Sequence, residues 1–220
     1  MKDKLATQDY IKTIAQLVIK DGSTLIKNKQ IASQLGVSIA AVNDMAKKLV
    51  KDKLVINHAY KGLELTSSGN RLGLQLIRHH RLWEVFLFKT LNIPWDQIHE
   101  EAEHLEHAAS PDLMNRIDAY LGYPKVDPHG NPIPSHSGEF QFSDSELQLT
   151  NCQIAQIYTL KRFESIDSHY LNYLAKHGFA ISVQISVVEI FEFDHSILVD
   201  INGTQLQLSE AIAEKIYVLP

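Results

Sequence analysis

Residues 28–49, NKQIASQLGVSIAAVNDMAKKL, decide the fold of the N-terminal part of this 220-residue chain. Asn28 can cap a short helix, and Gly36 can end that helix in a left-handed conformation. Ser38 follows at once as the cap of a second helix. The residues expected to face inward are Ile31, Ala32, Leu35, Ala41, Val42, Met45 and Leu49. Two short helices joined by a tight turn of this kind predict a helix-turn-helix.

The flanking sequence predicts one more helix before this pair and a two-stranded wing after it. Thr7 can cap the earlier helix, whose apolar face ends near Asp21. Apolar segments at 54–57 and 63–65 predict two strands that flank Tyr60-Lys61-Gly62. Residues 1–70 are therefore expected to form a winged helix-turn-helix domain.

Charge is divided unevenly along the chain. Residues 1–70 contain eleven lysines and six acidic residues, a net charge of +5, whereas residues 71–220 contain ten basic and twenty acidic residues, a net charge of −10. Only the first part would attract phosphate. Helix-turn-helix patterns also occur as ordinary helical corners, and lysines also cluster by chance. Because turn, wing and charge agree, we expect the first domain to bind DNA.

In this interpretation the helix that begins at Ser38 enters the major groove of DNA. Asn43 would read a base directly, because its amide can both donate to adenine and accept from it. Lysines would contact phosphates, which set the affinity and its salt dependence. The expected contacts are Ser38, Ile39, Ala40, Asn43 and Asp44 with bases or sugars, and Lys47, Lys48 and Lys61 with phosphates.

A long helix is expected to begin near Ser68 and to cover residues 72–91. It is apolar around most of its circumference, which is more surface than one neighbouring helix can cover. Part of it is therefore expected to contact a second subunit. A twofold dimer would also present two recognition helices to a palindromic site, about one DNA turn apart.

Histidines and carboxylates gather in the middle of the chain, where seven of the eleven histidines lie between His79 and His136. His80 and Glu84 are four residues apart and share a helix face. Pro94 can begin the next helix, which is expected to run to about residue 109. One face of that helix would carry His99, Glu103, Glu106 and His107. Glutamate-rich faces are usually solvated, but carboxylates and imidazoles at this spacing indicate a divalent-metal site.

The chain has a single cysteine, Cys152, which excludes an intrachain disulfide and a zinc ribbon. A metal would have to rely on oxygen and nitrogen ligands, which favours manganese or iron over copper. The N-terminus MKDKLATQDY lacks the apolar stretch of a signal peptide, and no apolar run approaches the ~20 residues needed to cross a bilayer. We therefore expect a cytoplasmic protein.

Three segments resemble the diphtheria toxin repressor and manganese transport regulator family of metal-dependent bacterial repressors. They are RHHRLWEVFL (78–87), IHEEAEHLEH (98–107) and DPHGNPIP (127–134), and they follow a winged helix of the expected length. The resemblance extends across the whole chain. It implies an α+β multi-domain protein with a winged helix-turn-helix at 1–70, a helical dimerisation and metal-binding domain at 71–140, and an SH3-like (FeoA-like) β-barrel at 148–220.

The last third of the chain fits a small barrel. Strands are expected at 153–161, 180–193, 196–201, 204–207 and 216–219, and a helix at 168–177. Asn202-Gly203 predicts a hairpin turn. A linker rich in Pro, Gly, Ser and His, from Leu121 to about Glu146, would precede the barrel. The barrel would pack against the metal-binding domain and contribute one ligand.

The resemblance implies two metal sites. The site nearer to DNA would use Asp9, Glu103, Glu106 and His107. The resemblance implies that iron-sensing members have methionine and cysteine, which are softer ligands, at the positions of Asp9 and Glu103. This chain has two carboxylates there, and their hard oxygen donors point to the manganese branch. Some manganese members carry a glutamate at the position of Lys12. A protonated lysine cannot bind a metal ion, so this chain departs from them at that position. An acidic residue in the first turn of a helix is also favoured by the helix dipole alone, which gives Asp9 a purely structural explanation.

The second implied site would use His80, Glu84, Asp127 and His129, together with an acidic residue from the C-terminal domain. Glu164 is the first choice for that residue and Asp167 the second. His99 resembles a ligand of the iron branch, and we expect it to support the ligands rather than to be one.

The implied function is a homodimeric repressor that binds a palindromic operator when Mn(II) is plentiful and controls metal-uptake genes in the bacterial cytoplasm. A shared ion would fix Asp9, on the DNA-binding head, relative to the dimer helices. Three alternatives remain open: an Fe(II)-responsive repressor of the same family, a metal-dependent hydrolase, and a constitutive DNA-binding protein with a structural metal. We expect a regulator and not an enzyme.

Overall fold

The computed structural model describes residues 2–95, 97–140, 145–164 and 167–220. The chain forms two compact units. The first comprises residues 1–80, 104–114 and 134–140, and the second comprises residues 81–103, 115–133 and 141–220. No helix among the described residues has both the length and the apolar character needed to span a membrane.

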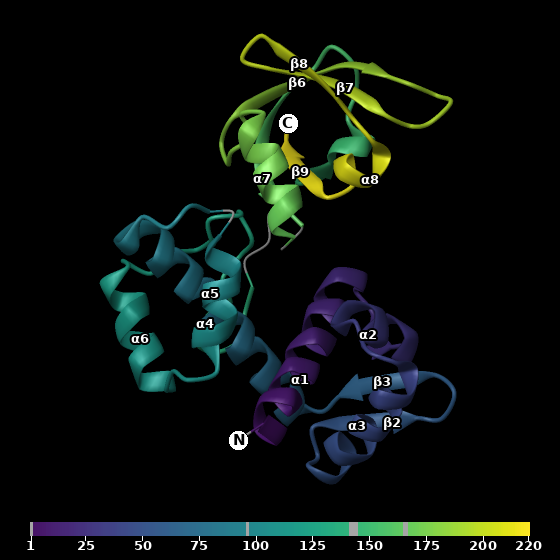
Figure 1. Cartoon of the computed structure of the whole chain (residues 1–220), viewed down its shortest axis with the longest axis vertical. Helices are drawn as coiled ribbons and strands as arrows, with labels where there is room; N and C mark the ends of the chain where they lie inside the picture. The colour runs from purple at the N-terminus through teal and green to yellow at the C-terminus, as the bar shows by residue number, and fades with distance from the viewer. Residues whose placement is uncertain (1, 96, 141–144, 165–166) are drawn as a thin grey trace. The chain divides into compact units, whose positions relative to one another are not determined.

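The first unit contains the predicted winged helix-turn-helix (Figure 1). Its elements are α1 (Lys2–Asp21), β1 (Leu25–Ile26), α2 (Asn28–Leu35), α3 (Ile39–Lys51), β2 (Val55–His58) and β3 (Gly62–Leu65). The strands form an antiparallel sheet in the order β1-β3-β2, so the wing has a short third strand that the sequence did not predict. Ile11, Ile14, Ile31, Val42 and Leu49 are fully buried and form the centre of the core.

The turn between α2 and α3 is built as the sequence predicts. Gly36 has a φ of 65°, the left-handed region in which glycine meets no steric penalty. Ser38 caps α3, since its Oγ accepts a hydrogen bond from the backbone N–H of Ala41 at 3.1 Å. Ala41 itself is exposed, so its expected inward position is wrong.

Two predicted helix caps are also wrong. Thr7 lies inside α1, because the helix begins at Lys2. Residues 2–6, KDKLA, contain no proline or glycine that would interrupt a helix. Asp9 therefore lies beyond the first turn, which removes the helix dipole as an explanation for its presence. Asn28 is the first residue of α2, and Lys27 is the cap. The side chain of Gln30 accepts a hydrogen bond from the Lys27 backbone N–H at 3.0 Å, which is the contact that the third helical residue makes in a capping box.

Three helices follow the wing: α4 (Ser67–Leu91), α5 (Ile98–Glu106) and α6 (Pro111–Tyr120). The long helix confirms the prediction for 72–91. The next helix is shorter than predicted, since Pro94 precedes it and residues 107–109 follow it. Helix α6 was not predicted.

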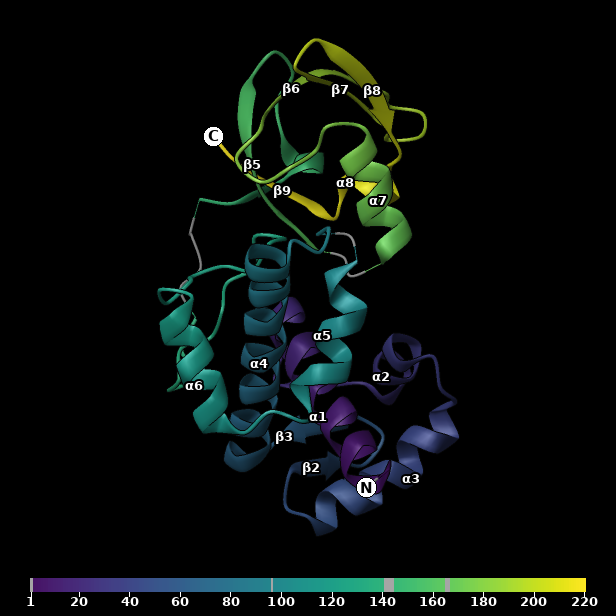
Figure 2. The same ribbon diagram turned by 60° about the vertical axis from the view of Figure 1, so that its left-hand side comes forward.

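The C-terminal part of the second unit is an antiparallel sheet in the order β4-β9-β5-β6-β7-β8 (Figure 2). Its elements are β4 (Leu147–Gln148), the 3-10 helix η1 (Leu149–Asn151), β5 (Ile157–Phe163), α7 (Ser168–Lys176), β6 (Gln184–Ile190), β7 (Ile197–Ile201), β8 (Thr204–Leu208), α8 (Glu210–Ala213) and β9 (Ile216–Leu219). The five predicted strands, the predicted helix and the turn at Asn202-Gly203 are present, although β5 begins later and β6 is shorter than predicted. Irregular register in β5 and β6 adds local twist, which helps a small sheet to curl.

The loop of DPHGNPIP is fastened to β5 inside the second unit. The backbone N–H of Phe163 donates to the carbonyl oxygen of His129 at 2.9 Å. Gly130 has a φ of 86°, and a Cβ built at this position would lie 2.0 Å from the carbonyl oxygen of Lys161. Only glycine permits so close an approach. Part of the linker predicted for 121–146, residues 141–144, lies outside the described residues.

Candidate metal centres and DNA-binding surface

Asp9 and His107 bring helix α1 and the end of α5 together inside the first unit. Nε2 of His107 lies 2.9 Å from Oδ1 of Asp9 and 3.4 Å from Oε1 of Glu106. Nδ1 of His107 lies 3.0 Å from Oε1 of Gln8. When Nδ1–H donates to Gln8, the Nε2 lone pair faces two carboxylates, which is how a histidine is held for a metal ion.

Glu106 is suited to the same purpose. Glu106 is 1% exposed, and its Oε1 is buried without a hydrogen bond among the described residues. A buried carboxylate oxygen in this state needs a cation or a proton. Two carboxylates and one imidazole form a hard donor set that fits Mn(II) or Fe(II).

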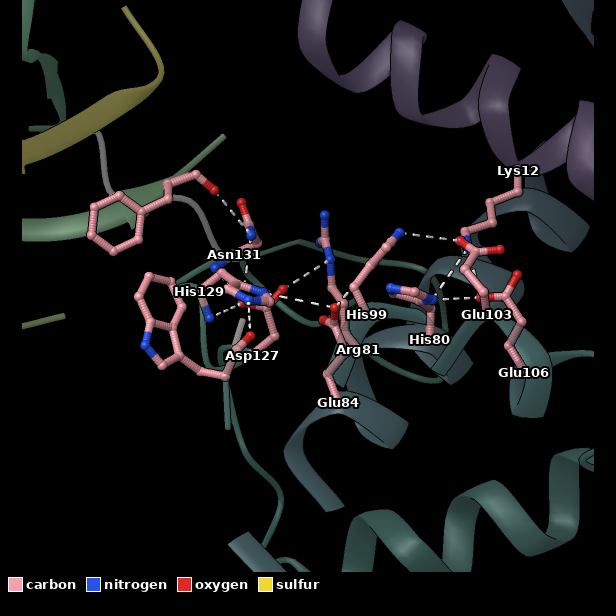
Figure 3. A network of polar contacts seen from close by, with 12 residues as sticks. Lys12, His80, Arg81, Glu84, His99, Glu103, Glu106, Asp127, His129 and Asn131 are labelled. Carbon is pink, nitrogen blue, oxygen red and sulfur yellow. Dashed lines mark hydrogen bonds and ion pairs between the residues drawn. The ribbon is translucent and has the colours of Figure 1, made fainter. Parts of the chain in front are cut away.

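A lysine occupies the other side of Glu106 (Figure 3). Nζ of Lys12 lies 2.6 Å from Oε2 of Glu106, and Nδ1 of His80 lies 2.6 Å from the same oxygen. Lys12 and His80 are 3.3 Å apart. The structure thus gives His80 a partner on α5, whereas sequence reasoning grouped it with Glu84. The only expectation for Lys12 from the sequence was that it cannot bind a metal ion while it is protonated.

Glu103 lies on α5, three residues before Glu106, which puts the two on one face of the helix, and His107 directly follows the last residue of α5. The boundary between the units falls directly after Glu103. Within its own unit Glu103 is near His99, with 3.8 Å between Oε1 and the imidazole Nε2.

A second group of possible ligands lies inside the second unit. Glu84, Asp127 and His129 are all buried and offer ligand atoms that lie within 4.8 Å of one another. Nδ1 of His129 is 3.7 Å from Oε1 of Glu84. Nε2 of His129 lies 2.8 Å from the carbonyl oxygen of Trp95. Donation to that carbonyl would fix the tautomer and leave the Nδ1 lone pair facing Glu84.

Asp127 forms hydrogen bonds within its own loop and lies near other ionisable groups. Its Oδ1 accepts hydrogen bonds from the backbone N–H groups of His129 at 2.8 Å and Asn131 at 2.9 Å. Arg81 lies 3.6 Å from the other carboxylate oxygen. Burial and the nearby Glu84 raise the pKa of Asp127, against the opposing effect of His129 and Arg81. A cation at this group would relieve that cost.

Glu164 and Asp167, the candidate ligands from the C-terminal domain, form hydrogen bonds with other groups. Oε2 of Glu164 accepts a hydrogen bond from the Tyr217 hydroxyl at 2.6 Å. Asp167 caps α7, since its Oδ1 accepts from the backbone N–H of His169 at 2.8 Å. His99 lies beside the group, with its Nδ1 3.4 Å from Oε1 of Glu84. Arg81 was missed by sequence reasoning, because its partner Asp127 is remote in the chain and no local pattern indicates the pair.

The expected DNA contacts lie on the surface of the winged helix. Ser38, Ile39, Ala40, Asn43, Asp44, Lys47 and Lys61 are exposed, and Lys48 is half-buried. Lys47 pairs with Asp44, with 2.8 Å between Nζ and Oδ1, and this carboxylate raises the pKa of Lys47. Tyr60 at the tip of the wing is fully exposed.

Three family models match the chain. They are "Iron dependent repressor, N-terminal DNA binding domain" over residues 5–63, "Iron dependent repressor, metal binding and dimerisation domain" over residues 66–135, and "FeoA domain" over residues 147–220. A solved structure of a manganese-dependent transcriptional repressor in complex with manganese superposes with a TM-score of 0.85. It is 35% identical and covers 97% of this chain and 99% of its own.

Two curated relatives agree with these matches. The transcriptional regulator MntR of Bacillus subtilis is 33% identical over 120 residues, which are 54% of this chain and 82% of MntR. The iron-dependent repressor IdeR of Mycobacterium tuberculosis is 34% identical over 128 residues, which are 58% of this chain and 55% of IdeR. The match to IdeR thus covers only about half of that protein.

A winged helix-turn-helix, a helical metal-binding and dimerisation domain and a FeoA domain in this order define a class of metal-dependent transcriptional regulators. Within that class, the chain belongs to the family of metal-dependent repressors that includes diphtheria toxin repressor and MntR. The resemblance stated from the sequence is therefore confirmed, as is the three-part fold class.

Proposed function

We propose that this protein is a repressor that binds operator DNA when Mn(II) is bound, and that its targets include genes for metal uptake. The observation that carries the proposal is the 2.9 Å approach of His107 to Asp9, because Asp9 belongs to α1 of the DNA-binding head and His107 follows α5. A ligand set that draws on both elements couples the position of the head to metal binding.

The proposed metal ligands are Asp9, Glu103, Glu106 and His107 at one site. A divalent ion would supply there the positive charge that the carboxylates share. Asp9 and His107 hold α1 against the end of α5, and they restrict the positions that the recognition helix can take. DNA binding and metal binding must then strengthen each other by the same factor, typically ~5 to ~150-fold.

We assign a second site to Glu84, Asp127 and His129, with His80 and Glu164 as further candidate ligands. The burial of the first three residues and the raised pKa of Asp127 support this assignment. Because Asp127 is also hydrogen-bonded to its own loop, a ligand at this site would make the loop more rigid.

Manganese is the metal that the ligands support best. Asp9 and Glu103 provide oxygen in place of softer sulfur, and hard oxygen donors suit Mn(II). The solved structure described above contains manganese, whereas the mycobacterial relative is named for iron. Fe(II) is therefore the alternative activator within the same function.

A homodimer would present two recognition helices to a palindromic operator. The second unit exposes apolar side chains that support such a contact. They are Phe88, Leu91, Tyr120 and Tyr123, and the rings of Phe86 and Tyr120 lie 6.3 Å apart. Exposed apolar groups on neighbouring helices are typical of a subunit interface. Because the proposed target is operator DNA, we also propose that the protein is located in the cytoplasm.

The test begins with a DNA site selected from a random pool by the Mn(II)-loaded protein. Footprinting of that site is then compared with Mn(II), with Fe(II) under anaerobic conditions, and after chelation. We expect protection with Mn(II) and its loss after chelation. Equal protection after chelation would support a constitutive DNA-binding protein with a structural metal and would contradict the proposal.

A further inference from the structure

Lys12 is a buried cation at a place where the proposed function requires another cation. It is 4% exposed, lies on α1, and reaches Glu106 on α5 with 2.6 Å between Nζ and Oε2. His80 on α4 contacts the same oxygen at 2.6 Å. All three residues lie in the first unit. Three separate helices are thus joined at a single buried carboxylate oxygen.

The two oxygens of Glu106 have different surroundings. Oε2 faces the ammonium of Lys12 and the imidazole of His80, whereas Oε1 faces His107, which in turn contacts Asp9. Lys12 is therefore not a ligand of the proposed ion, but it contacts the carboxylate that the ion would use. Both cations would act on the same negative charge.

This arrangement has an electrostatic consequence. A buried carboxylate without a cation is costly, and Lys12 removes that cost before any metal arrives. An ion that binds later finds a partly neutralised carboxylate and a second positive charge close by, and both effects weaken its binding. The apo protein is stabilised and the metal complex is weakened by the same ammonium.

We propose that Lys12 sets the metal threshold of this protein, by compensating the charge of Glu106 in the metal-free state and so raising the Mn(II) concentration needed for binding. The inference rests on the proposed function, since it takes Asp9, Glu106 and His107 as the ligands. It assigns to Lys12 a positioning and charge-compensating role that the ligand set alone does not contain.

The test compares variants of the whole protein without DNA. Lys12→Met removes the charge at similar length, and Lys12→Gln removes the charge but keeps a donor for Glu106. Thermal unfolding of the metal-free protein and direct titration with Mn(II) are the two measurements. We expect both variants to unfold at lower temperature without metal and to bind Mn(II) tighter by about tenfold or more. Mn(II) should then raise their unfolding temperature more than that of the unchanged protein.

Two controls separate the local effect from other causes. Lys4→Met removes the same charge from an exposed position of the same helix and should leave Mn(II) affinity close to that of the unchanged protein. Lys12→Arg keeps the charge and should not tighten Mn(II) binding. A tightening with Lys12→Arg, or an equal tightening with Lys4→Met, would overturn the local explanation.

A further variant distinguishes failure of this inference from failure of the proposed function. His107→Ala should abolish Mn(II) binding at the site of Asp9, Glu106 and His107 and leave the second site, at Glu84, Asp127 and His129, able to bind. If it binds Mn(II) as the unchanged protein does, the proposed ligand set is wrong. If His107→Ala loses binding at the first site while Lys12→Gln keeps the original affinity, the ligand set stands and the role of Lys12 in setting the threshold is overturned. Should Lys12→Met fail to fold, Lys12→Gln alone decides.

Discussion

The side-chain amide of Asn28 donates a hydrogen bond to Oδ1 of Asn43, with 2.7 Å between the two atoms. Asn28 is the first residue of α2, and Asn43 lies on the exposed face of α3. The bond holds the amide of the proposed base reader in one orientation, with its carbonyl oxygen turned toward α2. Asn28 thus influences which hydrogen-bonding groups Asn43 can offer to a base.

Asn28→Ala should broaden the base preference at the operator position read by Asn43, because the freed amide can rotate. Affinity for the best sequence should fall by less than about tenfold, since phosphate contacts are unchanged. Repeated selection from a random DNA pool measures the preference at each position. Asn57→Ala, at an exposed asparagine of the wing, is the matched control. An unchanged preference with Asn28→Ala would show that this bond does not orient the reader.

Lys47→Ala should weaken binding to all DNA sequences and reduce the salt slope of binding by about one unit, because one phosphate contact is lost. Asp44→Ala should have the opposite effect on affinity, since it releases Lys47 from the carboxylate 2.8 Å away. Titrations of DNA binding at several salt concentrations check both variants. An unaltered slope in Lys47→Ala would remove this residue from the phosphate contacts.

Glu103→Cys should shift the metal preference toward Fe(II) or Co(II), because a thiolate is a softer ligand than a carboxylate. Operator binding under anaerobic conditions, titrated with each metal, measures the change. Glu100→Cys places the same thiol one turn earlier on an exposed position and should keep the original preference. Unchanged Mn(II) activation of Glu103→Cys would count against Glu103 as a ligand.

Asp127→Ala should lower the free energy of unfolding by about 1–3 kcal/mol, because the backbone N–H groups of His129 and Asn131 lose their acceptor. Asp127→Asn keeps an acceptor oxygen but removes the charge, so it should be more stable than Asp127→Ala and still bind metal weakly. Chemical denaturation and metal titration separate the two roles. Equal metal affinity in Asp127→Asn and the unchanged protein would exclude the carboxylate as a ligand.

Cys152 should react slowly with Ellman's reagent at pH 8. Burial raises the pKa of its thiol to about 11, so the reactive thiolate is scarce, and labelling should be about a hundredfold or more slower than in the denatured protein. A raised pKa also means that stability from this group is present below the ordinary thiol pKa and is lost as the pH rises toward about 11. Because the chain has one cysteine, the label reports on this position alone. Labelling at the denatured rate would contradict the burial.

The elements that the sequence predicted best are those fixed by local chemistry. Gly36 and Ser38 define the turn of the helix-turn-helix within three residues, and Asn202-Gly203 defines a hairpin in two. Helix ends were less accurate, because several residues compete to cap them. Lys27 stands at the cap position expected for Asn28, and α1 already begins at Lys2, before Thr7.

For the candidate sites, the sequence predicted which residues could bind a metal ion but not which of their side chains contact one another. Helical spacing grouped Glu106 and His107 with Glu103, but no local pattern indicates that Lys12 reaches Glu106, which is 94 residues away in the chain. The pairing of Arg81 with Asp127 also depends on how distant segments pack. Contacts of this kind are determined by tertiary structure, so the sequence identified the candidate ligands but not Lys12 and Arg81 as their partners.

The attachment of the DPHGNPIP loop to β5 limits how this protein can be divided. A fragment that starts at residue 147 would keep Phe163 but lose the carbonyl of His129 to which its backbone N–H donates. It would also uncover the β5 backbone that Gly130 approaches, and leave part of a strand open to solvent and to other chains. An excised C-terminal piece is therefore at risk of self-association, and a cut upstream of the loop would yield a better-behaved domain.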